Sequence, residues 1–268
     1  MPDFKVKVAE LAFPEDRCCV GLANLEAMVG NISANQERIR QALACFRDHG
    51  VNLAVFPELS LSGYFWDDEA GCRSYMETAG LENQRGFIDG AVCSALDDTL
   101  RFVVLNILRQ STDPGEKRFV NSTLVVGRTA SGARVEAFYD KAVLPGIEKR
   151  YLVGGGGRRL VLETEWGRFG FLTCYDICYP SMLLGYHLLD RVDGIILAAS
   201  WRGPALRRYP GLGLESDDYY GHLWESLIPA QAATSQAWFF AANAVGRHAV
   251  SGDVFWGGQA SGRRRDTR

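Results

Sequence analysis

The chain has 268 residues, 47% of them hydrophobic, and a formal net charge of −3 at pH 7. This length and apolar content are enough for one large α/β domain. The charge argues against a nucleic-acid partner, and no apolar run approaches the roughly 20 residues that span a bilayer. The first residues, MPDFKVKVAEL, lack the apolar core of a signal peptide. We therefore expect a cytoplasmic protein that forms a single domain over residues 1–268.

The cysteines and histidines show no pattern typical of a disulfide framework or a structural metal site. The cysteines are Cys18, Cys19, Cys45, Cys72, Cys93, Cys174 and Cys178. Their number is odd, no C-x-x-C pair occurs, and the four histidines are scattered. We expect most of these thiols to pack as small hydrophobic side chains and no metal to be bound.

Apolar runs bounded by turn residues predict eight strands. They cover residues 51–58, 101–108, 121–127, 135–143, 158–164, 169–174, 193–200 and 237–246. Four of these runs, at 51–58, 169–174, 193–200 and 237–246, are almost continuously apolar. Continuous apolar runs are typical of strands that are covered on both faces.

Helical patterns lie between these strands. The first places four apolar residues on one face: Ile32, Ile39, Leu43 and Phe46. We expect Ser33 to cap its N-terminus and Gly50 to end it. Further helices are predicted over 84–98, from about Pro180, and over 219–235, where Pro229 should kink or restart the helix. Strands that alternate with helices and hairpins indicate an α/β sandwich.

Three of the predicted strands end in a residue with useful chemistry. Glu58 follows a buried strand, Lys141 lies near the end of a hairpin strand, and Cys174 ends the run GFLTC. Each has an ordinary alternative: a solvated loop glutamate, a surface lysine, a packed cysteine. However, functional groups gather at the carboxyl ends of strands in open α/β sheets, and a strand-to-helix turn offers free backbone N–H groups.

The segments around these residues resemble the three signature segments of the nitrilase superfamily, the carbon–nitrogen hydrolases. They read VFPELSLSGY, YDKAVLPG followed by EKRYLVGG, and GFLTCYDICYP. The resemblance extends over about residues 18–260. Within the superfamily, the chain is most similar to the amidase-like branch. It implies a four-layer α-β-β-α sandwich.

The resemblance also implies catalytic roles. Cys174 is expected to be the nucleophile, with a thiol pKa lowered by a nearby cation and helix-end N–H groups. Glu58 is the expected general base, and Lys141 with the backbone N–H of Tyr175 the expected oxyanion site. Glu148 matches a second glutamate that positions substrate. Lys149 competes for the lysine role, but it lies in a loop, whereas Lys141 ends a strand.

Aromatic residues near these segments are candidates for an apolar substrate pocket, with core packing as the alternative. They are Tyr64, Phe65, Trp66, Tyr175 and Trp201. Of these, Tyr64, Tyr175 and Trp201 are predicted with Glu148 to bind substrate. Asp176 is expected to anchor the turn after the cysteine. Cys178 is either a resolving thiol or a packing residue.

The predicted reaction is hydrolysis of a small amide through a thioester on Cys174, which releases ammonia and a carboxylic acid. The Tyr-Asp pair after the cysteine favours an amidase, because nitrilases of the family usually have Trp-Glu there. A nitrilase, an N-carbamoyl amide hydrolase, an acyltransferase and a catalytically silent ligand-binding homologue stay as alternatives. No cofactor, nucleic acid or membrane is expected.

The C-terminal tail departs from the family. Residues 261–268 end in GRRRDTR, where relatives continue with a further strand pair. We interpret the tail as a truncated or frameshifted end. The family resemblance predicts a homo-oligomer, to the extent that this end permits association.

Overall fold

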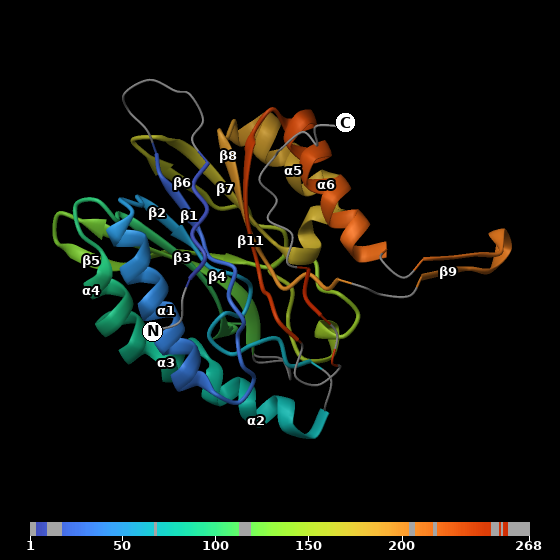
Figure 1. Ribbon diagram of the computed structural model, residues 1–268, viewed down its shortest axis with the longest axis horizontal. Helices are drawn as coiled ribbons and strands as arrows, with labels where there is room; N and C mark the ends of the chain where they lie inside the picture. Colours follow the sequence, from blue (N-terminus) through green and yellow to red (C-terminus); the bar gives the residue numbers. More distant parts are fainter. Residues whose placement is uncertain are drawn as a thin grey trace.

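The structure is a computed structural model, and it describes residues 4–9, 18–66, 69–112, 119–203, 207–216, 219–247, 252 and 254–256. Two β-sheets lie at its centre, with helices on both outer sides (Figure 1). The predicted tail at 261–268 lies outside the described residues.

The first sheet contains five strands in the order β1-β2-β3-β4-β5. These are β1 (Val20–Leu22), β2 (Leu53–Val55), β3 (Phe102–Gln110), β4 (Phe119–Thr129) and β5 (Gly132–Asp140). The first three run parallel, whereas β3, β4 and β5 are joined antiparallel. The β4–β5 hairpin places residue 140 beside residue 122. The end of β5 therefore lies beside the start of β4.

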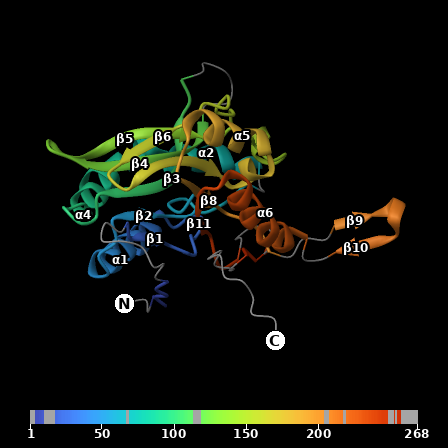
Figure 2. The same cartoon turned by 90° about the horizontal axis from the view of Figure 1, so that it is seen from above.

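The second sheet has the order β11-β8-β7-β6. Its strands are β6 (Val161–Thr164), β7 (Gly167–Thr173), β8 (Gly194–Ala199) and β11 (Trp238–Asn243). The strands β7, β8 and β11 are parallel, and β6 pairs antiparallel with β7. A separate hairpin of β9 (Arg207–Tyr209) and β10 (Leu214–Ser216) extends away from the body of the molecule (Figure 2).

Helical segments cover both sheets. On the first sheet they are α1 (Ile32–Asp48), α2 (Glu69–Ala79), α3 (Leu81–Phe87), η1 (Ile88–Val92) and α4 (Cys93–Ala95). The remaining segments are η2 (Glu148–Arg150), η3 (Cys174–Cys178), α5 (Pro180–Gly185), η4 (Tyr186–Asp190), η5 (Pro210–Leu212) and α6 (Tyr219–Ser235). Among the helices that the structure describes, none is long and apolar enough to cross a membrane.

Three buried apolar clusters define the layers. Ile39 and Leu43 of α1 pack with Val103 of β3. Between the sheets, side chains of the first sheet such as Val104 meet side chains of the second such as Phe171. On the other side, α6 packs against β8 in a cluster that also contains Cys174. The predicted four-layer α-β-β-α sandwich is therefore the observed architecture, with two helix–sheet interfaces and one sheet–sheet interface.

All eight predicted strands exist, but several elements differ from prediction. The strand β1, the hairpin β9–β10 and the helix α2 were not predicted. The helix predicted over 84–98 consists of α3, η1 and α4, which together span residues 81–95. Pro229 lies inside α6 without restarting it. Proline removes one backbone donor, and neighbouring packing by Trp224 and Ile228 holds the helix together.

The N-terminal cap of α1 also differs from prediction. Asn31, not Ser33, is the cap residue, and its side chain accepts the backbone N–H of Ala34 at 3.1 Å. Ser33 lies within the first turn and is exposed. The helix therefore begins earlier than the serine position indicated.

This cap provides a test of the observed helix start. Replacing Asn31 by Ala removes the side-chain acceptor and should lower the free energy of unfolding by about 1 kcal/mol. Urea denaturation of Asn31→Ala, with Ser33→Ala as the matched control, measures the difference. An equal or larger loss from Ser33→Ala would contradict this assignment.

Candidate active site

Three loops at the ends of strands carry the predicted catalytic residues. Glu58 lies in the turn after β2, Lys141 is the first residue after β5, and Cys174 follows β7 at the start of η3. The first two come from one sheet and the third from the other. The structure brings these three side chains together in one buried cluster that draws on both sheets.

Lys141 connects two carboxylates. Its Nζ lies 2.7 Å from Glu58 Oε1 and 2.8 Å from Glu148 Oε1, and all three side chains are fully buried. Burial opposes the charged ammonium, but the carboxylates of Glu148 and Glu58 outweigh burial and raise the pKa of Lys141. The lysine is therefore a fixed cation in the site. Lys149, the alternative, is exposed to solvent.

Glu148 is held on one oxygen only. Its Oε1 accepts hydrogen bonds from Lys141 and from the hydroxyl of Tyr64, the latter at 2.8 Å. Burial raises the pKa of Glu148, and the ammonium of Lys141 opposes this shift. Its Oε2 is buried and has no hydrogen-bond partner among the described residues. One buried acceptor of the cluster therefore lacks a donor within the described part of the chain.

Glu58 is fixed at both its side chain and its backbone. Its Oε1 also accepts from Asn121 Nδ2 at 2.9 Å, and its Oε2 accepts from the backbone N–H of Ser200 at 2.9 Å. The hydroxyl of Ser200 donates to the Glu58 carbonyl at 2.8 Å. Donors from both sheets therefore determine where this carboxylate lies.

Cys174 has an unusual backbone. Its φ of +46° lies in the left-handed region, which non-glycine residues rarely adopt. The preceding strand ends at Thr173 and the following 3₁₀ turn begins with the cysteine itself. A strained residue between a strand and a helical turn is a common way to present a nucleophile.

The predicted lowering of the Cys174 pKa is wrong. Burial, and then the carboxylate of Glu58, raise the pKa of this thiol well above its ordinary value. Lys141 and the N–H of Ser200 act in the opposite direction but do not outweigh them. The thiol is therefore neutral at rest, and any reaction at Cys174 requires a base to remove its proton.

Asp176 ties the cysteine turn to the segment that carries Lys141. Its Oδ2 accepts from the Thr173 N–H at 2.9 Å and from the Tyr139 hydroxyl at 2.8 Å, and its Oδ1 accepts from the Val143 N–H at 2.8 Å. Tyr139 and Val143 lie two residues on either side of Lys141. Asp176 therefore anchors the turn after the cysteine, as expected, and it also links the two sheets.

Comparison with known proteins places the chain in a family. A family model described as carbon-nitrogen hydrolase matches residues 19–261. The chain belongs to the carbon–nitrogen hydrolase family. This match confirms the family predicted from the sequence segments.

Curated relatives are distant in sequence. A deaminated glutathione amidase from Escherichia coli O157:H7 is 25% identical over 79% of this chain and 72% of its own length. A probable nitrilase from Schizosaccharomyces pombe is 25% identical over 73% of this chain. The chain spans 62% of that nitrilase and 28% of a matching glutamine-dependent NAD(+) synthetase from Xylella fastidiosa.

Solved structures share the fold. An amidase from Nesterenkonia sp. superposes with a TM-score of 0.72 at 19% identity, covering 92% of this chain and 82% of that one. A mutant of the amidase from Nesterenkonia sp. AN1, which has a TM-score of 0.70 at 19% identity, carries acrylamide joined by Michael addition to its active-site cysteine. The NAD+ synthetase from Acinetobacter baumannii has a TM-score of 0.66 at 22% identity, covering 88% of this chain and 39% of its own.

The predicted substrate-binding aromatic residues of this carbon–nitrogen hydrolase lie in different surroundings. Tyr64 contacts Glu148 directly. Tyr175 is half-buried next to Cys174, with its ring edge-on to Tyr179 at 5.5 Å. Trp201 is buried, and its indole N–H donates to the Tyr220 carbonyl at 2.6 Å.

Phe65 and Trp66 belong to the core. Both are buried, their ring centroids lie 4.4 Å apart, and Trp66 stacks on Tyr151 at 5.7 Å. These contacts favour the packing interpretation for this pair.

Two residues of the site were missed by the sequence analysis, Asn121 and Ser200. Each left a weak signal, because each is a polar residue within or next to an apolar strand. A buried polar side chain needs a partner, and in both cases the partner is Glu58.

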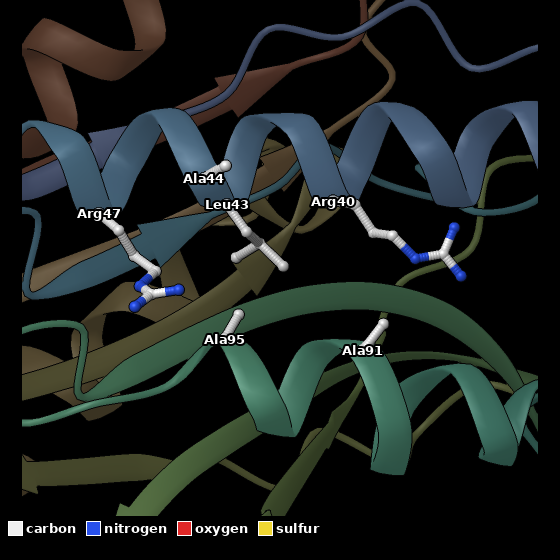
Figure 3. Close-up of a pocket in the computed structure, with 6 residues that line it drawn as sticks. All are labelled: Arg40, Leu43, Ala44, Arg47, Ala91 and Ala95. Carbon is white, nitrogen blue, oxygen red and sulfur yellow. The ribbon is translucent and has the colours of Figure 1, made fainter.

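Within the described residues, no group of three or more His, Cys, Asp or Glu side chains is arranged to hold a metal ion. Figure 3 shows a pocket between α1 and the η1–α4 segment, and none of the three catalytic candidates lines it. It is lined by Arg40, Leu43, Ala44, Arg47, Ala91 and Ala95.

The Asp176 link provides a test of how the site is assembled. Asp176→Ala leaves two backbone N–H groups and one hydroxyl without their acceptor, and should lower the free energy of unfolding by at least about 3 kcal/mol. Tyr139→Phe removes a single donor and should cost about 1 kcal/mol. Urea denaturation compares the two variants. If Asp176→Ala is no less stable than Tyr139→Phe, the link does not hold the turn.

Proposed function

We propose that the protein is a thiol hydrolase that cleaves the non-peptide carbon–nitrogen bond of a small amide and releases ammonia and a carboxylic acid. The observation that carries this proposal is the buried Lys141 ammonium, shared between Glu58 and Glu148 beside Cys174. Amide carbonyls are poor electrophiles, so their hydrolysis needs a nucleophile, a base and an oxyanion site together.

In the first half-reaction, Glu58 takes the proton of the neutral Cys174 thiol while the sulfur attacks the amide carbon. The negative charge that develops on the carbonyl oxygen is stabilised by Lys141 and the backbone N–H of Tyr175. The carbon–nitrogen bond then breaks. Glu58 returns its proton to the departing nitrogen, so ammonia leaves and a thioester on Cys174 remains.

In the second half-reaction, Glu58 takes a proton from water as the water oxygen attacks the thioester carbon. The carbon–sulfur bond breaks, and the sulfur recovers the proton from Glu58. The products are a carboxylic acid and the neutral thiol. The active-site cysteine of the Nesterenkonia amidase, which has the same fold, supports the choice of Cys174 as nucleophile.

Glu148 favours an amide over a nitrile. Its free Oε2 is a buried acceptor, and a primary amide carries N–H donors that can fill it. A nitrile nitrogen has no hydrogen to donate, so the acceptor would stay unpaired. The two carboxylates also outnumber the single ammonium, which favours a neutral reacting group over an anionic one.

Several predictions from the sequence are carried forward as part of this proposal. Tyr64 acts through Glu148, and Tyr175 and Trp201 contribute to the substrate pocket. An N-carbamoyl amide hydrolase, a nitrilase, an acyltransferase and a silent ligand-binding homologue are the alternatives. A cytoplasmic homo-oligomer with no cofactor, and with neither nucleic acid nor membrane as a partner, stays a prediction. The exposed side chains of Leu184, Leu188 and Leu189 favour association.

The reaction is tested with a substrate panel. Small aliphatic and aromatic amides, nitriles and carbamoyl amino acids are incubated with the protein and scored for ammonia. We expect ammonia to be released from at least one amide. Intact mass and peptide mapping should detect an acyl adduct on Cys174. Cys174→Ala should abolish ammonia release and the acyl adduct. This variant should unfold at the same urea concentrations as the wild type. If amides bind but no product forms, the silent ligand-binding homologue is favoured. If product forms only when hydroxylamine is added as the acyl acceptor, the acyltransferase is favoured.

The role of the lysine is tested with a matched pair. Lys141→Met leaves Glu58 and Glu148 buried without their cation, and should lower the free energy of unfolding by about 3–5 kcal/mol. In whatever fraction folds, kcat/KM should fall by roughly 10²–10³ or more, because the oxyanion loses its charged donor.

Lys149→Met is the control for this pair. Lys149 is exposed, so its replacement should change stability by less than about 0.5 kcal/mol. Ammonia release and urea denaturation are measured on both variants. A greater loss of activity in Lys149→Met would reverse the assignment.

A further inference from the structure

We propose that Asn121 is a positioning residue that fixes the Glu58 carboxylate and thereby decides which of its oxygens removes the Cys174 proton. This inference rests on the proposed function, because it assigns Glu58 the role of base. It deepens that function by adding a residue of β4 to the site.

The β4–β5 hairpin places Asn121 next to Lys141. The backbone N–H of Lys141 donates to the Asn121 carbonyl at 2.8 Å, so the two residues are neighbours across the strands. Their side chains then reach the same atom. Asn121 Nδ2 lies 2.9 Å and Lys141 Nζ 2.7 Å from Glu58 Oε1.

The two donors occupy one oxygen and leave the other available. A carboxylate oxygen accepts about two hydrogen bonds, so Oε1 of Glu58 is filled by Asn121 and Lys141. Oε2 has one donor, the N–H of Ser200, and the same N–H also interacts with the Cys174 sulfur. Oε2 and the thiol therefore share the Ser200 N–H, and Oε2 accepts fewer hydrogen bonds than Oε1.

The orientation of the Asn121 amide is determined by chemistry. An ionised Glu58 can only accept, so the NH2 group must face it and the carbonyl must point away. Asn121 Oδ1 is then buried with no donor among the described residues. An unpaired buried carbonyl costs free energy, so an apolar residue would serve the strand better. The asparagine is explained by its contact with Glu58.

Asn106 provides the contrast. It is also fully buried in this sheet, but both ends of its amide are paired. Its Oδ1 accepts from the Leu59 N–H at 2.9 Å, and its Nδ2 donates to the Thr123 hydroxyl at 3.0 Å. This asparagine supports the backbone without touching the Glu58 carboxylate, which makes it a matched control.

The experiment replaces the donor by an isosteric acid. In Asn121→Asp, an ionised side chain cannot donate to Glu58, repels it and competes for Lys141, whereas a protonated side chain restores the hydrogen bond. Two carboxylates this close share a proton as the pH falls. The charged and titratable groups that face this position are Glu58, Lys141, Glu148, Cys174 and Tyr64.

Two rates are measured across pH: ammonia release from the best amide of the panel, and alkylation of Cys174 by iodoacetamide, followed by peptide mass. We expect Asn121→Asp to be roughly tenfold slower than wild type at about pH 8 and to approach wild type at about pH 5.5. Asn121→Ala should be slower by a similar factor at both pH values. Asn106→Asp should keep the pH profile of the wild type. Circular dichroism at each pH reports the folded fraction.

A failure of this inference can be distinguished from a failure of the proposed function. If no panel compound is hydrolysed, the function fails, while the alkylation rates still test Asn121. A rate ratio of Asn121→Asp to wild type that does not change with pH, or that follows the folded fraction, would overturn the inference. So would the same pH dependence in Asn106→Asp. If Asn121→Ala does not fold, the pH dependence of the isosteric variant decides.

Discussion

The ammonium of Lys141, buried between two carboxylates, is the interaction on which the site depends. An isolated buried charge costs several kcal/mol, so Lys141, Glu58 and Glu148 are stable only together. The three lie on separate segments, after β2, after β5 and in η2. The cluster therefore forms only when the sheet is complete and the connecting loops have closed over it. Folding of the core and assembly of the site are in this sense one event.

The same constraint explains the resting state of the cysteine. Two carboxylates and burial keep the thiol neutral, although a cation lies close by. A neutral thiol is a poor nucleophile and resists oxidation, because the thiolate is the reactive form. Reactivity then depends on an oriented base, and the structure orients Glu58 with donors from both sheets. The link through Asp176 keeps the cysteine turn in register with that base.

The sequence predicted the strands well because buried strands are continuous apolar runs, and the family resemblance supplied the four layers. It missed β1, which has only three residues, and α2, whose buried face consists of Cys72, Met76 and Ala79 rather than branched aliphatic residues. It placed Glu58, Lys141 and Cys174 on separate strand ends, but their distances depend on register and loop closure. The direction of the thiol pKa was wrong because sequence shows neither burial nor how many carboxylates approach. Asn121 was missed for the same reason, since only strand pairing places it beside Lys141.

The unpaired acceptor on Glu148 connects this architecture to the substrate class that we propose. A buried oxygen without a donor costs about 1–3 kcal/mol, and a bound amide N–H would recover that free energy. In the proposed reaction, a substrate without such a hydrogen would leave the cost in place and bind about 5- to 150-fold more weakly. Lys141 bonds Oε1 of both glutamates, and in the proposed reaction its third N–H serves the carbonyl oxygen of the substrate. In the proposed reaction, the cluster that holds Lys141 in place therefore also presents an acceptor that suits an N–H of the substrate.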